Sequence, residues 1–355
     1  MRKLFIALLG VLLVLLLALG IATWRLSQPK FEESLRGDPQ ESLTVAPPET
    51  ALTLARVGAG NRARVVLVID ARPDGLAVID LESAFGRPFR DAVDAFHELG
   101  YEALEQAAGG PATERLALID LGLPFDPADP HIAAGTNYRA HAEEVGLEEG
   151  PFLFPKLSMP TPWNADVPPK TRLDYEAELC AVTLTPHTPS SPARLGYLLC
   201  NDFTDRWKLL EGLDFDEPMG TTGFPDAKGG DGMLPVGPFL VIPRQADGFH
   251  RDLVLELYVN GRLRQRARAG LMIWSPSEIV ARAFDDCDVV YQRSEGTVGL
   301  TDCTAIPART LILTGTPGGV MFHVLTVWYP GAYLERGDEV WTLAPFLGVL
   351  HNRVR

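Results

Sequence analysis

An uncharged apolar stretch near the N-terminus is the feature that most restricts how this chain can fold. It runs from Leu4 to Trp24 and consists mainly of Leu, Val, Ile and Ala. A helix of this length would measure about 31 Å at about 1.5 Å per residue, which matches the hydrocarbon core of a bilayer. Residues 1–26 are therefore predicted to form a single transmembrane anchor.

Two other interpretations of this stretch remain open. Gly20-Ile21-Ala22 could serve as the cleavage site of a signal peptide, although the apolar part of a signal usually spans only roughly 7 to 15 residues. Burial in a soluble core is the third interpretation. Arg2 and Lys3, together with the terminal amine, favour a cytoplasmic N-terminus. We therefore expect a membrane-anchored, single-pass protein whose main domain lies on the non-cytoplasmic side, in the periplasm or outside the cell.

Composition indicates a folded, acidic protein. Hydrophobic residues make up 46% of the 355 residues and charged residues 22%, which is close to the average of globular domains. The formal net charge is −14, so the chain lacks the basic surface with which proteins usually bind nucleic acid. Nucleic acid is therefore not expected as a partner.

Changes in pattern divide the chain after the anchor into three parts. Residues 27–51 are rich in proline and polar residues and are predicted to be a linker. Residues 52–130 contain two apolar runs around Pro73-Asp74-Gly75 and then a helical pattern over 88–107, which predicts a small α+β module. Residues 131–355 are dominated by short apolar runs separated by Gly and Pro, which is typical of many strands. The predicted fold class is α+β, mainly β.

The four cysteines fall into two pairs of different surroundings. Cys180 and Cys200 lie in apolar, strand-like segments, where a cysteine is usually a small buried hydrophobic residue. Cys287 and Cys303 lie in polar sequence that is typical of a loop, and they could pair in an exported domain.

Three acidic residues suggest a metal site. Glu176 and Glu178 are two residues apart, so in a strand both would point to the same face. Asp202 follows the next apolar run. Carboxylates held this close repel one another unless a cation or a proton neutralises them, and three of them suit Mg²⁺, Mn²⁺ or Ca²⁺. The alternative is that the alternating glutamates mark the solvent face of an exposed strand.

A histidine and a lysine could supply proton transfer and charge stabilisation. His141 and Glu144 are three residues apart and would share one helical face, so that Glu144 could orient the imidazole as a base. Such a pair is also common on exposed helices. Lys228 lies in a glycine-rich segment, where a solvated lysine would be the ordinary interpretation.

Taken together and in order, these segments resemble the fumarylacetoacetate hydrolase family, from about Pro124 to Val340. The motifs that carry the resemblance are Asn137-Tyr-x-x-His-x-x-Glu144, Leu173-Asp-Tyr-Glu-Ala-Glu-Leu179, Asn201-Asp-x-Thr-x-Arg206, Lys228 followed by Pro235-Val-Gly-Pro238, Tyr258-Val-Asn-Gly261, Leu313-Thr-Gly-Thr-Pro-Gly-Gly-Val320 and Gly337-Asp-Glu-Val340. The resemblance implies a catalytic domain that is a roll of mixed β-strands, often dimeric, which leaves a homodimer open.

The resemblance also implies roles for individual residues. Glu176, Glu178 and Asp202 match the family's metal ligands, which usually hold Mg²⁺ or Mn²⁺. His141 and Glu144 match the pair that deprotonates water, and Lys228 matches a lysine beside the metal. Arg206 and Thr316 match substrate-binding positions.

The sequence departs from the family pattern beside the arginine. Many members have a glutamine three residues after it, where this chain has Leu209. One polar contact to the substrate is therefore missing, and the identity of the substrate is not determined.

The resemblance implies a divalent-metal-dependent hydrolase that cleaves a carbon–carbon bond in a small 1,3-dicarbonyl acid of the acylpyruvate or fumarylacetoacetate kind. The same scaffold also permits decarboxylation, isomerisation or hydration. A catalytically silent, membrane-tethered binding protein is the alternative from another class.

Overall fold

The strands of the small module and of the main domain form one continuous sheet. The computed structural model describes residues 2–58, 60, 63–147, 149–191, 193–246 and 248–355, so Met1 of the predicted anchor and residues 59, 61 and 62 of the predicted module lie outside the described residues. In that part of the chain the largest sheet has ten strands. Their order is β4 (Glu114–Leu116), β3 (Gly75–Asp80), β2 (Arg64–Arg72), β1 (Ala51–Val57), β11 (Leu240–Pro243), β9 (Leu195–Asn201), β8 (Ala177–Thr183), β16 (Leu311–Leu313), β5 (His131–Gly135) and β6 (Phe152–Lys156).

A second sheet and two short ribbons complete the β-structure. The second sheet has the order β13 (Arg262–Arg268), β12 (Val254–Val259), β17 (Glu339–Ala344) and β18 (Gly348–Arg353). The ribbons pair β7 (Leu173–Asp174) with β10 (Thr204–Asp205) and β14 (Val290–Arg293) with β15 (Gly296–Gly299). β16 runs parallel to β5 and antiparallel to β8, so the large sheet is mixed. The predicted mainly β, α+β fold is confirmed.

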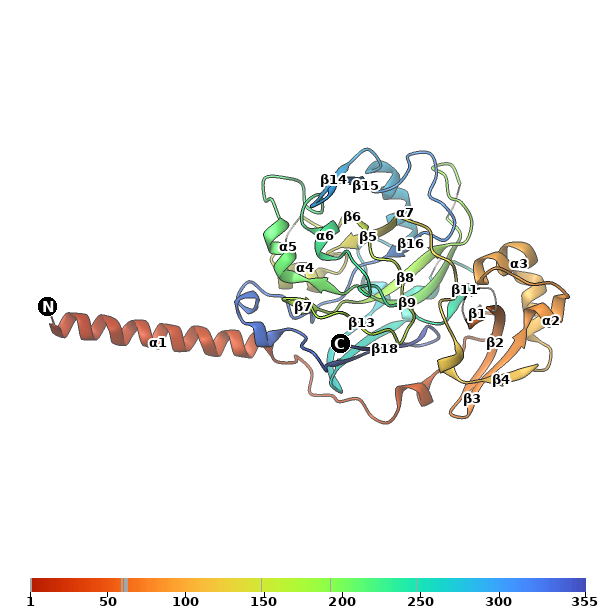
Figure 1. Ribbon diagram of the computed structural model, residues 1–355, viewed down its shortest axis with the longest axis horizontal. Coiled ribbons are helices and arrows are strands. Elements are labelled where there is room, and N and C mark those ends of the chain that lie inside the picture. The colour runs from red at the N-terminus through yellow and green to blue at the C-terminus, as the bar shows by residue number, and fades with distance from the viewer. Residues whose placement is uncertain (1, 59, 61–62, 148, 192, 247) are drawn as a thin grey trace.

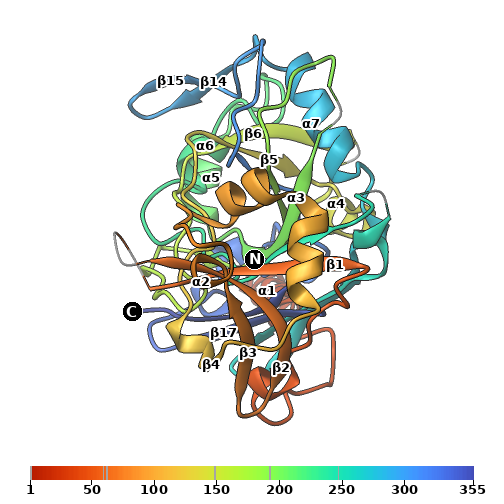
Figure 2. The same cartoon turned by 90° about the vertical axis from the view of Figure 1, so that its right-hand side faces the viewer.

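Helices are few and mostly short outside the N-terminus. They are α1 (Arg2–Ser27), α2 (Leu81–Phe85), α3 (Ala92–Ala108), α4 (Arg139–Val145), α5 (Arg206–Gly212), α6 (Phe224–Ala227) and α7 (Pro276–Asp285). Helix α3 begins later than the apolar pattern over 88–107 predicts, because Asp91 caps it by accepting a hydrogen bond from the amide of Asp94. α3 packs on β1 and β2 at the module end of the molecule (Figure 2).

Helix α1 extends away from the body at the end opposite the module (Figure 1). Its stretch Leu8–Ser27 is long and apolar enough to cross a bilayer, and none of the assessed span is buried in the structure. The apolar part of an N-terminal signal sequence has the same properties. The anchor and the signal peptide are therefore both compatible with α1, whereas burial in a soluble core is not observed.

The segment predicted as a linker is attached to the body rather than hanging free. The amide of Leu35 donates to the carbonyl of Gly261 at 2.7 Å, and the amide of Leu263 donates to the carbonyl of Glu33 at 3.1 Å. The carbonyl of Ser27 accepts a hydrogen bond from Arg264 at 3.0 Å. These contacts fasten the C-terminal end of α1 to the β12–β13 hairpin.

Candidate active site

The pairing of β8 with β9 brings the three predicted metal ligands together. Glu178 lies in β8, Glu176 directly precedes it, and Asp202 directly follows β9. Because the strands are antiparallel, with Glu178 opposite Cys200, the start of β8 lies beside the end of β9. One carboxylate oxygen from each of the three side chains lies within 4.8 Å of the others. All three residues are buried, so the exposed-strand alternative for the glutamates does not apply.

Two buried lysines contact these carboxylates. Lys228 Nζ donates to Glu176 Oε2 at 2.5 Å and to Asp202 Oδ2 at 2.8 Å. Lys156 Nζ, at the end of β6, donates to Asp202 Oδ1 at 2.5 Å and to the carbonyl of Lys228 at 2.5 Å. Lys228 was predicted from the sequence and Lys156 was not. In the sequence, Lys156 is only a lysine at the end of an apolar run, which is ordinary for a strand that reaches solvent.

Arg206 is held between two acidic residues at the start of α5. Its Nε donates to Asp174 Oδ2 at 2.8 Å and its Nη2 donates to Glu176 Oε1 at 2.5 Å. Asp174 is fully buried and also accepts hydrogen bonds from the amides of Met321 and Phe322. Asp174 was not predicted as a site residue, yet it fixes both Arg206 and the loop that carries Phe322.

The charges of this cluster push the pKa values of two glutamates in opposite directions. Burial alone would raise the pKa of Glu176, but the ammonium of Lys228 and the guanidinium of Arg206 lower it to about 2. For Glu178, burial and the charges of Asp202 and Glu176 outweigh the ammonium of Lys228 and the amide of Gly315, and they raise its pKa well above the usual range. Glu178 is therefore the carboxyl group that most needs an added cation before it ionises.

The predicted His–Glu pair lies at one wall of the same site, on α4. His141 Nδ1 lies 3.7 Å from Glu144 Oε2, which is an ion-pair distance but too long for a hydrogen bond. Glu144 also accepts hydrogen bonds from Lys30 at 2.6 Å and from the amide of Gly319 at 2.9 Å. Burial favours the neutral form of Glu144, but His141, Lys30 and Gly319 outweigh it and lower its pKa.

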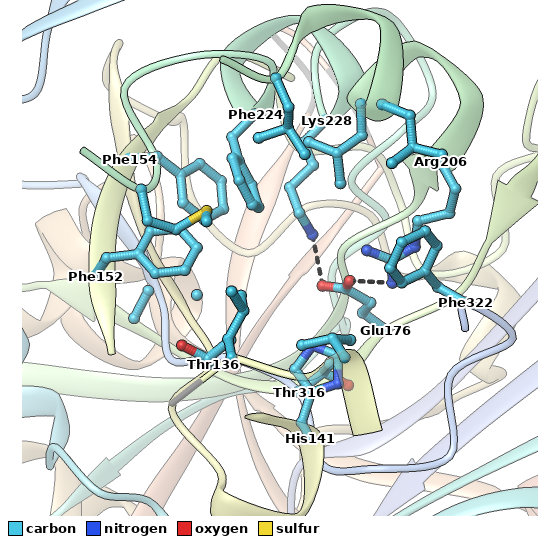
Figure 3. A pocket seen from close by; sticks show the side chains of 18 of the residues that line it. Thr136, His141, Phe152, Phe154, Glu176, Arg206, Phe224, Lys228, Thr316 and Phe322 are labelled. Atoms are coloured by element: carbon cyan, nitrogen blue, oxygen red, sulfur yellow. Dashed lines mark hydrogen bonds and ion pairs between the residues drawn. The ribbon is translucent and has the colours of Figure 1, made fainter. Parts of the chain in front are cut away.

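These side chains surround one cavity of about 240 Å³. His141, Glu176, Arg206, Lys228 and Thr316 all line it, with Lys228 and Arg206 on one side of Glu176 and His141 and Thr316 on the other (Figure 3). The hydroxyl of Thr316 already donates to the carbonyl of Ala177 at 3.0 Å and accepts from Gln265 at 2.8 Å. The predicted site residues that face the cavity thus come from five separate segments of the chain.

The remainder of the cavity is apolar. Phe224 lies 5.0 Å from Phe152 and 5.2 Å from Phe154, measured between ring centroids. Leu209 also lines the cavity, at the position where relatives were expected to carry a glutamine. Trp207 does not line it and instead packs edge to face on Trp328.

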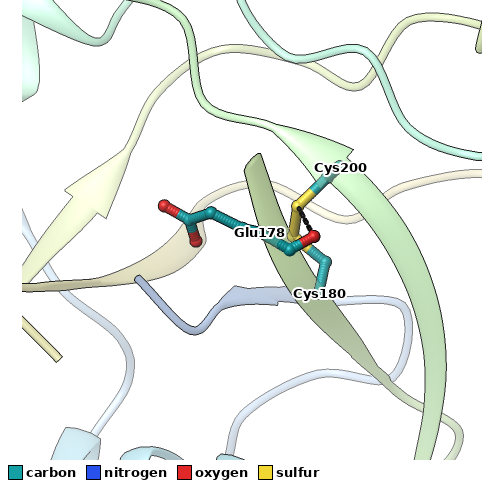
Figure 4. A group of neighbouring side chains, drawn as sticks. All are labelled: Glu178, Cys180 and Cys200. Atoms are coloured by element: carbon teal, nitrogen blue, oxygen red, sulfur yellow. Dashed lines mark hydrogen bonds between the residues drawn. A yellow bond between two sulfur atoms is a disulfide. The ribbon is translucent and has the colours of Figure 1, made fainter. Parts of the chain in front are cut away.

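Disulfides join both cysteine pairs. Cys287 pairs with Cys303, as the sequence left open. Cys180 pairs with Cys200, so the interpretation of these two as separate buried hydrophobic residues was wrong. They face each other because they occupy adjacent strands in near register, which apolar character alone does not reveal. One carboxylate oxygen of Glu178 and the two sulfur atoms lie within 4.8 Å of one another (Figure 4).

The residues of the carboxylate cluster fit a hard divalent cation. Glu176, Glu178 and Asp202 offer only oxygen atoms, and burial together with the charges of the other two raises the pKa of Glu178 well above its usual range. Oxygen donors of this kind suit Mg²⁺, Mn²⁺ and Ca²⁺ rather than softer metals. A bound cation would supply the positive charge that ionised Glu178 lacks.

The fold and the site together define a class of protein. Residues 130–355 match the family described as fumarylacetoacetate (FAA) hydrolase C-terminal. The chain belongs to the fumarylacetoacetate hydrolase family, a family of enzymes.

Individual relatives carry different activities. The chain is 29% identical over 248 residues to a 2,4-didehydro-3-deoxy-L-rhamnonate hydrolase of a Sphingomonas species, covering 65% of this chain and 77% of that protein. It is 29% identical over 242 residues to the oxaloacetate tautomerase YisK of Bacillus subtilis, covering 64% and 70%. Among solved structures, a putative HpcE protein from Mycobacterium smegmatis aligns with a TM-score of 0.62 at 25% identity, covering 85% of this chain and 98% of that one.

Proposed function

We propose that this protein is a divalent-metal-dependent hydrolase that cleaves a carbon–carbon bond in a 1,3-dicarbonyl acid of the acylpyruvate kind. The observation that carries the proposal is that Glu176, Arg206, Lys228 and His141 line one cavity, and that Glu178 and Asp202 each bring a carboxylate oxygen within 4.8 Å of one of Glu176. Glu176, Glu178 and Asp202 would hold Mg²⁺ or Mn²⁺, with Ca²⁺ a weaker candidate. The bound cation would act as a Lewis acid that polarises substrate oxygens.

The side chains of this chain then have distinct tasks. His141, oriented by Glu144, would accept a proton from water while the water oxygen bonds to the carbonyl carbon farther from the acid. The adjacent carbon–carbon bond breaks, its electron pair forms the enolate of the keto acid, and protonation of the enolate gives the second product. Arg206 and Lys228 would orient the acid and balance the negative charge of the enolate.

A variant of the proposed base tests this proposal. His141→Ala should lower kcat on acylpyruvates by about 10²- to 10⁴-fold, which is the usual contribution of a general base. Binding of Mn²⁺ should be nearly unchanged, because His141 is not one of the three proposed ligands. Metal binding by the wild-type protein without any metal-dependent turnover of such acids would instead favour the silent binding protein.

Tautomerisation of a dicarbonyl acid is the second candidate, favoured by the similarity to an oxaloacetate tautomerase. Decarboxylation and hydration remain further alternatives on the same scaffold. Product analysis separates them: hydrolysis yields two acids, whereas a tautomerase changes the keto–enol ratio without cleaving the chain. Formation of ¹⁸O-labelled product in H₂¹⁸O, with one label in the newly released acid, would support hydrolysis.

We further propose that α1 anchors the protein in a membrane with the catalytic domain on the non-cytoplasmic side. The uncharged stretch Leu4–Trp24 within α1 and the two disulfides support this, since disulfides persist mainly in oxidising compartments. Alkaline phosphatase and green fluorescent protein fused after residue 40 test the orientation. Fluorescence without phosphatase activity would contradict it, and loss of residues 1–26 from the mature chain would show a cleaved signal.

A homodimer is proposed from the family resemblance alone, and light scattering of the detergent-solubilised chain tests it.

A further inference from the structure

The cavity is divided into a charged end and an apolar end. The charged end contains Glu176, Arg206 and Lys228, and both cations already pair with Glu176 there. The apolar end begins at Phe154, whose ring centroid lies 5.7 Å from Lys228 Nζ, and continues through Phe152 and Phe224. A substrate held by its acid group at the charged end therefore places its other end against aromatic rings.

Among the described residues, the apolar end has no cation that could pair with a second charged group. Of the described residues that line the cavity, the two permanent cations are Arg206 and Lys228, both at the charged end. A distal carboxylate or a chain of hydroxyl groups placed against Phe152 and Phe224 would lose its hydration, and the hydroxyl of the nearby Thr136 already donates to the carbonyl of Gly150 at 2.9 Å (Figure 3). Burying such a group costs free energy, whereas burying methylene groups there is favourable.

Two exposed apolar side chains continue the apolar end of the cavity to its mouth. The apolar end and these two side chains together are called the apolar wall. Phe215 and Val324 line the cavity, although 80% of Phe215 and 68% of Val324 are exposed. Single exposed apolar residues are ordinary, but these two stand at the opening of an apolar cavity. An apolar chain longer than the cavity would therefore remain in contact with protein as it leaves the opening.

The mouth also lies on the side of the molecule from which α1 extends. The short helical turn Thr326–Trp328 contacts α1, and Trp328, 70% exposed, packs on Trp207 at the start of α5. Figure 1 shows α4 and α5 at this same end of the body. With α1 in a bilayer, the opening of the cavity would face the membrane surface, where amphiphilic molecules are concentrated.

We infer that the substrate is an amphiphile: a 2,4-dioxo acid whose acyl group is an unbranched apolar chain, taken up at the membrane surface. The inference rests on the proposed function, and it replaces the fumarylacetoacetate-like alternative with a substrate that has no second acid. The charged end binds the dicarbonyl acid, while the wall of Phe152, Phe224 and Phe215 binds the chain.

A series of acyl chain lengths tests the inference with the full chain in phosphatidylcholine vesicles and Mg²⁺. From acetylpyruvate to octanoylpyruvate, kcat/KM should rise by about threefold for each methylene group that the wall buries. Octanoylpyruvate should therefore exceed acetylpyruvate by at least about 100-fold. Turnover of acetylpyruvate that equals or exceeds that of octanoylpyruvate would overturn the inference.

A binding measurement separates the failure of this inference from the failure of the proposed function. N-alkyl oxamates present the same acid and carbonyl group and cannot be cleaved by the proposed reaction. If no dioxo acid is turned over but octyl oxamate binds at least about 100-fold more tightly than methyl oxamate, the apolar wall still binds an unbranched chain, whereas the hydrolase proposal and its dioxo acid substrate fail. Equal affinity for the two oxamates overturns the inference, whatever the catalytic result.

Two matched surface variants test whether the apolar wall causes the difference in affinity between octyl and methyl oxamate. Phe215→Glu places a charge at the mouth and should reduce the octyl-to-methyl affinity ratio by about tenfold. Because Phe215 is exposed, this change should not prevent folding. Ile119→Glu, at a residue 64% exposed in the module at the other end of the molecule, should leave the ratio unchanged. Equal ratios in the Phe215→Glu variant and the wild type would overturn the assignment of the wall.

Discussion

Lys30, in the segment that follows the N-terminal helix, donates a hydrogen bond of 2.6 Å to Glu144, the acid of the proposed catalytic pair. The two residues are 114 positions apart in the chain. Glu144 is largely buried and faces His141 with its other oxygen, whereas Lys30 is mostly exposed. The segment next to the proposed anchor thus contributes directly to the electrostatics of the proposed base.

Removing this ammonium should shift the pH profile of the enzyme. Lys30 is one of the groups that lower the pKa of Glu144, so Lys30→Met should raise that pKa. If the reaction needs ionised Glu144, the acid limb of the kcat/KM profile moves to higher pH together with that pKa. Arg36→Met, which removes an exposed charge from the same segment, is the control. Identical acid limbs for the Lys30→Met variant and the wild type would rule out the coupling.

Metal binding should become stronger as the pH rises. A group whose pKa is raised by folding stabilises the folded state most below its unfolded pKa, and this contribution is lost as the pH increases toward the folded pKa. For Glu178, the metal-free protein should therefore lose thermal stability as the pH rises above about 4.3, the ordinary pKa of glutamate. Because Mn²⁺ needs the ionised carboxylate, the increase in Tm on adding Mn²⁺ should be larger at pH 8 than at pH 6.

Glu178→Gln checks the source of this dependence. The amide is similar in shape but neutral at every pH, so the variant should show a flatter Tm profile without metal and should bind Mn²⁺ at least about 100-fold more weakly. This estimate exceeds the loss of about 10- to 100-fold typical for residues that only support a ligand. Glu82→Gln, at an exposed position of α2, should behave as the wild type. Calorimetric titration with Mn²⁺ measures both affinities.

Arg206 should not be replaceable by lysine. Its planar guanidinium contacts Asp174 with one nitrogen and Glu176 with another, which a single ammonium cannot reproduce. Arg206→Lys should raise KM for the acid by about tenfold or more and should destabilise the fold, because Asp174 keeps a buried charge with a poorer partner. Arg72→Lys, on the exposed end of β2, should change neither quantity. Steady-state kinetics and denaturant unfolding provide the comparison.

The disulfide between Cys180 and Cys200 should stabilise the fold around the proposed metal ligands. Cys180 lies two residues after Glu178, and Cys200 lies two residues before Asp202. Closing a loop of this size restricts the unfolded chain, which is worth about 3 kcal/mol. The Cys180→Ser, Cys200→Ser double variant should lose about that much unfolding free energy and bind Mn²⁺ more weakly.

The second disulfide provides the matched comparison. Cys287 and Cys303 close a loop of similar length, and their sulfur atoms group with the carboxylate of Asp288 and not with those of Glu176, Glu178 and Asp202. Their double variant should lose comparable unfolding free energy and keep its Mn²⁺ affinity. Peptide mapping under non-reducing conditions verifies both pairings in the wild type, and equal effects of the two double variants on Mn²⁺ affinity would contradict the special role of the first.

The sequence by itself determined the types of the main elements. The apolar runs around Pro73-Asp74-Gly75 predicted the hairpin of β2 and β3, the pattern over 88–107 predicted α3, and the short apolar runs over 131–355 predicted a domain of many strands. Strands, turns and helices of this kind depend mainly on residues close together in the sequence, so the local sequence pattern predicts them. The ordered motifs likewise predicted His141, Glu176 and Lys228, all of which line one cavity.

Only the tertiary structure decided which distant residues meet. Lys156, Asp174 and Lys30 act in the site through partners 46, 32 and 114 residues away. The pairing of Cys180 with Cys200 depends on the register of two strands, and the apolar end of the cavity is assembled from β6, α6 and the segment around Phe215. Strand pairing and side-chain packing bring such residues together through contacts that no local spacing records. For this reason, the sequence indicated the chemistry of the end proposed to bind the acid, and the folded chain alone revealed the apolar surface proposed to bind the other end of the substrate.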